Sequence, residues 1–97
     1  MRKGETAAYL AQESPLLDLA RRRIEGHDPA QAMALLAQHA RRFPRGQLEE
    51  EREALWIQAL VASGDGERAR ARELEFRRRF PHSIQLYVVE AALSAMK

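Results

Sequence analysis

Apolar residues recur every three or four positions along most of the chain, and short polar breaks separate these stretches. This spacing gathers apolar side chains on one face of a helix. Ser14-Pro15 and Asp28-Pro29 each place a capping side chain before a proline at the first helical position, so helices are predicted to begin there. Gly26 is expected to end the first helix and Phe43-Pro44 the second. Residues 1–13 are predicted to form a flexible or short helical extension.

Three more helices are predicted in the second half of the chain. The first covers about 47–63 and is apolar on nearly every side after its opening turns, which is typical of a buried central helix. The second covers 67–80, with Asp65 as its cap. The third covers about 84–96, with Ser83 as its cap, and its core-facing residues are expected to be Ile84, Val88, Ala91 and Ala95.

Composition supports an all-α fold. Alanine occurs 17 times, and the charged residues are mostly Arg and Glu, which are good helix formers. Only seven residues are β-branched, too few to build a sheet. There is no cysteine, which excludes disulfides and thiolate metal sites. No apolar run approaches the ~18 residues that a membrane span requires.

The two halves of the chain repeat each other. Phe43-Pro44 recurs as Phe80-Pro81, 37 residues later. The same shift superimposes further pairs, namely Asp28 on Asp65, Ala32 on Ala69, and Arg41-Arg42 on Arg78-Arg79. One helical hairpin cannot bury its apolar face alone, so repeated hairpins are expected to stack on each other.

This unit resembles the tetratricopeptide repeat (TPR). The small positions and closing prolines of the two repeats correspond to Ala20, Ala32 and Pro44, and to Ala69 and Pro81. The 37-residue spacing and the Phe-Pro-x-Gly/Ser sequence are similar to bacterial cell-envelope TPR proteins of the Tol-Pal accessory and outer-membrane assembly lipoprotein kind. The resemblance implies an antiparallel helix-hairpin stack, a TPR-like α-solenoid, over residues 14–97, with two repeats, a capping helix and about five helices in all.

The resemblance also implies a function. TPR domains are protein-interaction scaffolds that bind a peptide or a partner domain in the groove lined by the first helix of each pair. Carried over by position, Arg21, Glu51 and Gln58 are expected to face that groove. No catalysis and no cofactor are expected. A bacterial cytoplasmic or periplasmic location follows from the resemblance, with the envelope favoured if the chain is part of a longer protein.

Two alternatives remain open at this stage. The apolar residues of the last helix that are left over from its predicted inward stripe could form a homodimer surface, and these are Tyr87, Val89, Leu93 and Met96. The triplets Arg21-Arg22-Arg23 and Arg77-Arg78-Arg79 could bind nucleic acid. A net charge of +2 with interspersed glutamate argues against the second alternative, and solvated helix ends explain the triplets.

Other candidate chemistry has simpler explanations. His27, His39 and His82 show no metal-binding spacing, and no serine lies in a nucleophile motif. Glu49-Glu50-Glu51 matches the positive end of a helix dipole, and consecutive helical residues point in different directions, so a metal site is not expected. Trp56 is expected to be core or half-buried, with a role as a binding hot spot as the alternative.

Overall fold

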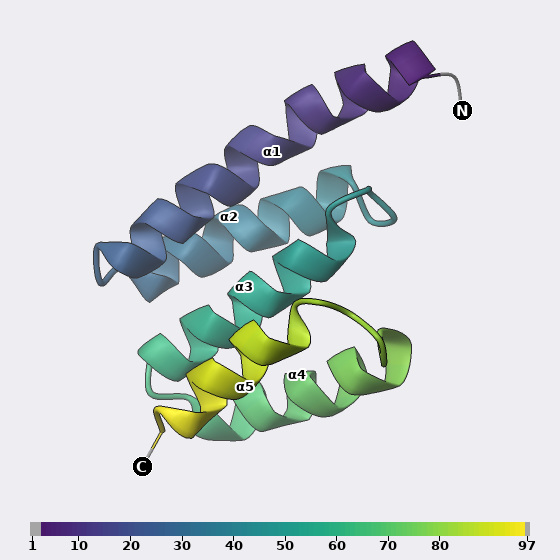
Figure 1. The fold of residues 1–97 in the computed structure, drawn as a ribbon. Helices are drawn as coiled ribbons and strands as arrows, with labels where there is room; N and C mark the ends of the chain where they lie inside the picture. The colour runs from purple at the N-terminus through teal and green to yellow at the C-terminus, as the bar shows by residue number, and fades with distance from the viewer. Residues whose placement is uncertain (1–2, 97) are drawn as a thin grey trace.

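The computed structural model describes the backbone of residues 3–96 and the side chains of residues 14–96. Its five helices are α1 (Lys3–Glu25), α2 (Pro29–Arg42), α3 (Glu49–Ala62), α4 (Gly66–Arg79) and α5 (Leu86–Ser94), and the described residues contain no strand. Figure 1 shows α1 and α2 at one end of the molecule and α4 and α5 at the other, with α3 between them. The predicted all-α stack of helical hairpins is confirmed.

The central position predicted for the third helix is also confirmed. Helix α3 contacts all four other helices. Leu55 and Ala59 pack on one side of it with residues of α1 and α2, whereas Ala54, Ile57 and Leu60 pack on the other side with residues of α4 and α5. A helix that buries two faces must be apolar nearly all round, which is what its sequence shows.

The turns inside the two hairpins have the same geometry. The amides of His27 and Asp28 donate hydrogen bonds to carbonyls in the last turn of α1, and those of Gly64 and Asp65 do the same at the end of α3. These paired bonds form a Schellman motif, in which one residue adopts a left-handed conformation. That residue is His27 (φ 62°) in the first turn and Gly64 (φ 82°) in the second.

The helix starts and ends repeat as well. Asp28 and Asp65 each accept a hydrogen bond from the amide three residues later, at 3.2 and 3.1 Å, as predicted for capping residues. Phe43 and Phe80 end α2 and α4 with nearly equal backbone angles, φ −134° and ψ 60° against φ −130° and ψ 61°. The 37-residue repeat of the sequence is therefore a repeat of the backbone.

One predicted feature of the first helix is wrong. Helix α1 does not begin at Ser14-Pro15 but runs through it, with Pro15 in the interior. An interior proline removes one backbone hydrogen bond and crowds the carbonyl four residues earlier, which weakens a helix, but its fixed φ is still compatible with the helical conformation. The helix ends directly before Gly26, as predicted, and the left-handed residue of the turn is His27.

The inward face of the last helix was also predicted wrongly. Val89 and Leu93 belong to the core, and Leu86 and Met96 pack against them, whereas Ile84 is 79% exposed. Both stripes fit a helical period, and the stripe that is buried carries the larger apolar side chains, so its burial removes more apolar surface from water. Leu74 of α4 is also exposed.

Candidate functional site

The three residues predicted to share a groove lie in one hollow. Arg21 comes from α1, while Glu51 and Gln58 come from α3, and all three line a cavity of about 350 Å³. The rest of its lining is Ile24, Glu25, Leu55, Gln85, Tyr87 and Val88. We call this cavity the α1–α3–α5 hollow. It brings together residues from both hairpins and from the last helix, so it exists only when the hairpins stack.

An ion pair spans this hollow between the two hairpins. Arg21 donates a hydrogen bond to Glu51, and it also contacts Asp18 one turn back on α1 at 3.4 Å. The Glu51 side chain is less exposed than the Arg21 side chain. The pair therefore fixes the direction of both side chains at the wall of the hollow.

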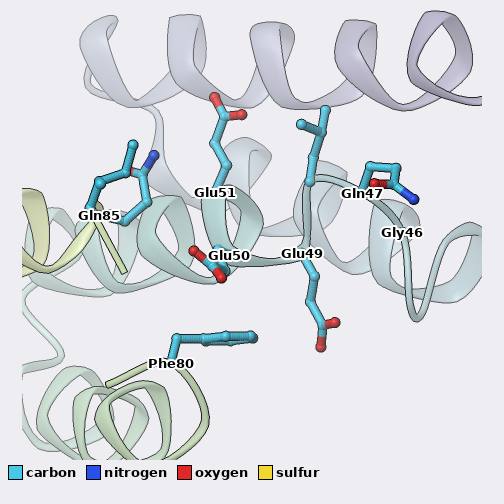
Figure 2. Close-up of a pocket in the computed structure, with 9 residues that line it drawn as sticks. Gly46, Gln47, Glu49, Glu50, Glu51, Phe80 and Gln85 are labelled. Atoms are coloured by element: carbon cyan, nitrogen blue, oxygen red, sulfur yellow. The ribbon is translucent and has the colours of Figure 1, made fainter. Parts of the chain in front are cut away.

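The first turn of α3 sends its three glutamates to three different elements. Figure 2 shows Glu51 pointing toward α1 and Glu49 pointing the opposite way, on the side of Phe80. Glu49 pairs with Arg79 of α4, and Glu50 accepts a hydrogen bond from Ser83 Oγ at 2.7 Å. The helix dipole predicted to explain these residues is thus accompanied by contacts that hold α3 to its neighbours.

The same turn borders a second cavity. Its volume is about 400 Å³, and it adjoins the α1–α3–α5 hollow because Glu51 and Gln85 line both. No group of three or more metal-ligating side chains is found among the described residues. The divergence of the glutamates in Figure 2 explains why this acidic turn does not make one.

The arginines of the last turn of α4 are engaged by carboxylates. Arg77 contacts Glu73 and Glu90, Arg78 contacts Glu75, and Arg79 contacts Glu49. Hydrogen bonds to Glu73 and Glu90 raise the pKa of Arg77, and the bond to Glu75 raises that of Arg78. These carboxylates offset the positive charge that a nucleic-acid surface would present.

Most of the residues predicted to form a dimer surface pack into the core instead. Val89 and Leu93 are buried, and Met96 packs against the same core. Tyr87 is the one residue of that set with a large exposed fraction, 72%, and it lines the α1–α3–α5 hollow.

None of the helices described is long and apolar enough to cross a membrane.

The sequence analysis did not predict the burial of two structurally important residues. His39 and Arg52 are both buried, with Arg52 Nη1 lying 3.5 Å from His39 Nδ1. Polar residue types ordinarily mark exposed positions, so neither was expected in the core. The sequence does contain one indication that both positions are buried. The 37-residue shift aligns His39 with Phe76 and Arg52 with Val89, which are apolar.

Comparison with models of protein families, with curated proteins and with solved structures found no match to this chain. The functional argument therefore depends on the geometry of the chain itself.

Proposed function

We propose that this chain is a non-catalytic protein-interaction module that binds a peptide or a partner domain in the α1–α3–α5 hollow. One observation carries the proposal: Arg21, Glu51 and Gln58, which come from different hairpins, line a single cavity together. The resemblance of the sequence to tetratricopeptide repeats adds support, since that family uses the corresponding helices for binding.

The lining indicates what kind of segment would fit. Gln58 and Gln85 offer amide donors and acceptors, which suit a peptide backbone. The ring of Tyr87 supplies an exposed aromatic surface of the type enriched at binding hot spots. Glu25 and Glu51 outnumber Arg21 by one charge, so the preferred segment carries a basic side chain beside an apolar one.

Selection from a displayed library of random peptides tests this function. The wild-type protein should enrich peptides with the basic and apolar pattern, and Gln58→Ala/Tyr87→Ala should bind them at least about tenfold more weakly, because it removes two hollow-lining groups. Arg70→Ala, on the exposed side of α4 away from the hollow, serves as the matched control. Selected peptides that bind the double variant as well as the wild type would contradict the proposal.

A charge reversal adds a second, independent readout. Arg21→Glu should shift the selection toward peptides with more basic residues, because it replaces the one cation of the hollow. An unchanged sequence preference would mean that bound peptides do not contact this wall. Circular dichroism of each variant checks that the helices are retained.

A further inference from the structure

A cavity larger than the α1–α3–α5 hollow lies away from the proposed site. Its volume is about 820 Å³, and it opens between α2 and α4 with α3 as its floor. Its apolar lining includes Met33, Trp56 and Leu60, and we call it the α2–α4 groove. With about 3.6 residues per turn, the α3 residues of this groove and those of the α1–α3–α5 hollow lie on opposite sides of the helix.

Charged side chains along this groove form a row of ion pairs that has an arginine at each end. Arg79 pairs with Glu49, which lies 3.7 Å from Arg52. Arg52 is 2.9 Å from Glu53, and Glu53 is 3.0 Å from Arg72. Three guanidinium groups therefore share two carboxylates, which leaves one positive charge uncompensated.

The arginines at the two ends of this row of ion pairs are the ones that solvent reaches. Arg72 and Arg79 keep about a third of their side-chain surface exposed, whereas Arg52 is buried. Arg68 adds a further cation at the rim, with a contact to Asp65 at 3.5 Å between two exposed side chains. Such exposed pairs are weak, so Arg68 can exchange this carboxylate for another at little cost.

Trp56 gives the groove an apolar center. The ring is half-buried, and the guanidinium carbon of Arg72 lies 3.7 Å from its centroid. Met33 and Leu60 are beside it on the lining. The groove thus combines an aromatic and aliphatic floor with an excess of positive charge at its edges, a combination typical of protein-binding hot spots.

We propose that the α2–α4 groove binds an acidic amphipathic segment of another protein. Apolar side chains of that segment pack on Trp56 and Leu60, and its carboxylates pair with Arg68, Arg72 and Arg79. This site is separate from the hollow of the proposed function and selects the opposite charge. The protein would therefore hold two different segments on opposite sides of α3.

The geometry favors an acidic protein segment over nucleic acid. Arg72 already covers one face of the Trp56 ring, which a base would need for stacking. Glu53 and Glu75 also line the groove, and a peptide can place uncharged side chains beside them, whereas a phosphate backbone carries a negative charge at every nucleotide. The aliphatic floor offers no hydrogen bonds to base edges, but it suits Leu or Phe side chains.

Fluorescence of Trp56 reports directly on this groove, because it is the only tryptophan of the chain. The probe is a synthetic helical peptide with Leu on one face and Glu on the other, and its control replaces every Glu by Gln. The Glu peptide should change the emission in a saturable way and bind at least about tenfold more tightly than the Gln peptide. Equal binding of the two, no saturable change, or tighter binding of single-stranded RNA would overturn the proposal.

A matched pair of variants locates the binding. Arg68→Glu and Arg70→Glu make the same charge change on the same helix, but Arg68 lines the groove and Arg70 lines a cavity beside α5. Arg68→Glu should weaken binding of the Glu peptide about tenfold and Arg70→Glu by less than about twofold. Similar losses in both variants would show that only the net charge matters, and would overturn the assignment to this groove. The α1–α3–α5 hollow is untouched by either change, so peptides selected for it should bind as before.

Discussion

The two hairpins share a backbone, but each buries different chemistry where its second helix packs on the helix that follows. His39 of α2 is buried together with Arg52 of α3, and the residues 37 positions later, Phe76 of α4 and Val89 of α5, are also buried. The ring of His39 lies 5.3 Å from that of Phe43, and the ring of Phe76 lies the same distance from that of Phe80. The arrangement of rings is therefore kept while the polarity of the core changes.

The pair of His39 and Arg52 can be buried between α2 and α3 because its polar atoms find partners. Arg52 Nη1 donates to the carbonyl oxygen of Phe43 at 3.2 Å, and Arg52 Nε donates to Glu53 at 2.9 Å. No buried side-chain nitrogen or oxygen among the described residues lacks a hydrogen-bond partner. A buried charge is tolerated only under this condition, since an unpaired one costs several kcal/mol or more.

The comparison shows which features define the unit. The Asp caps, the left-handed turn residue and the buried Ala32 and Ala69 are common to both hairpins, and the interior pair is not. Hydrogen bonds and close helix contacts fix the backbone, and the remaining space accepts either a satisfied polar pair or an apolar one.

The largest expected effect on stability comes from truncating Phe76, the apolar counterpart of His39. Phe76→Ala should lower the free energy of unfolding by about 3–5 kcal/mol, because it leaves a cavity among Ile57, Ala69 and Val89. His39→Ala should cost at least about 1 kcal/mol less, because His39 lies outside the two apolar clusters. Urea denaturation of the two variants measures both values, and an equal or larger loss for His39→Ala would contradict this account.

Exchanging the interior pair tests whether the units are interchangeable. Arg52→Val alone should cost about 1–3 kcal/mol, because it removes the charged donor from Phe43 O and Glu53. Adding His39→Phe reproduces the apolar pair of Phe76 and Val89 at this position and should recover at least about 1 kcal/mol of that loss. Urea denaturation of both single variants and the double variant gives the coupling. If the stability losses of the two single variants simply add, the surroundings fit His39 and Arg52 better than an apolar pair.

The two turns differ in the residue that occupies the left-handed position. Gly64→Ala should destabilise the protein by about 1 kcal/mol, because a Cβ is strained at that backbone angle. His27→Gly should stabilise it by about 0.5–1 kcal/mol, because it relieves the same strain in the first turn. Thermal unfolding gives both signs, and a destabilising His27→Gly would mean that the histidine side chain holds the turn.

The smallest effect is a pH dependence found in the second unit. The hydrogen bond from Arg78, with the charges of Arg78 and Arg79, lowers the pKa of Glu75. A carboxyl with a lowered folded-state pKa stabilises the protein above its unfolded-state pKa, and this contribution is lost as the pH falls through the folded-state pKa. The equivalent residues of the first unit are Gln38 and Arg41, which cannot contribute in this way.

Glu75→Gln tests this contribution. The variant should be slightly less stable than the wild type at neutral pH, and the difference should vanish in acid, where the wild-type carboxyl is protonated. Because the pair is exposed, the difference should also shrink at high salt. A stability difference that grows toward acid pH would contradict the assigned direction of the pKa.

Local signals in the sequence predicted the local features of the fold. Asp28 and Asp65 were identified as caps because Asn, Asp and Ser accept from the first free amides of a helix. The prediction that Arg21, Glu51 and Gln58 share a groove depends instead on the resemblance to the tetratricopeptide repeat. By contrast, Val89 and Leu93 were assigned to the wrong face, since α5 carries two apolar stripes and its periodicity does not choose between them.

The sequence by itself determined that the chain forms helical hairpins, where most of them turn, and that they repeat every 37 residues. These properties depend on caps, prolines and periodicity, whose hydrogen bonds and steric limits act within a few residues. Only the tertiary structure decided that Arg52 and His39 share a core, that Glu49 and Glu53 each join two arginines, and that a groove opens beside Trp56. Those features depend on side chains that meet across helices, and their contacts are set by how the hairpins stack.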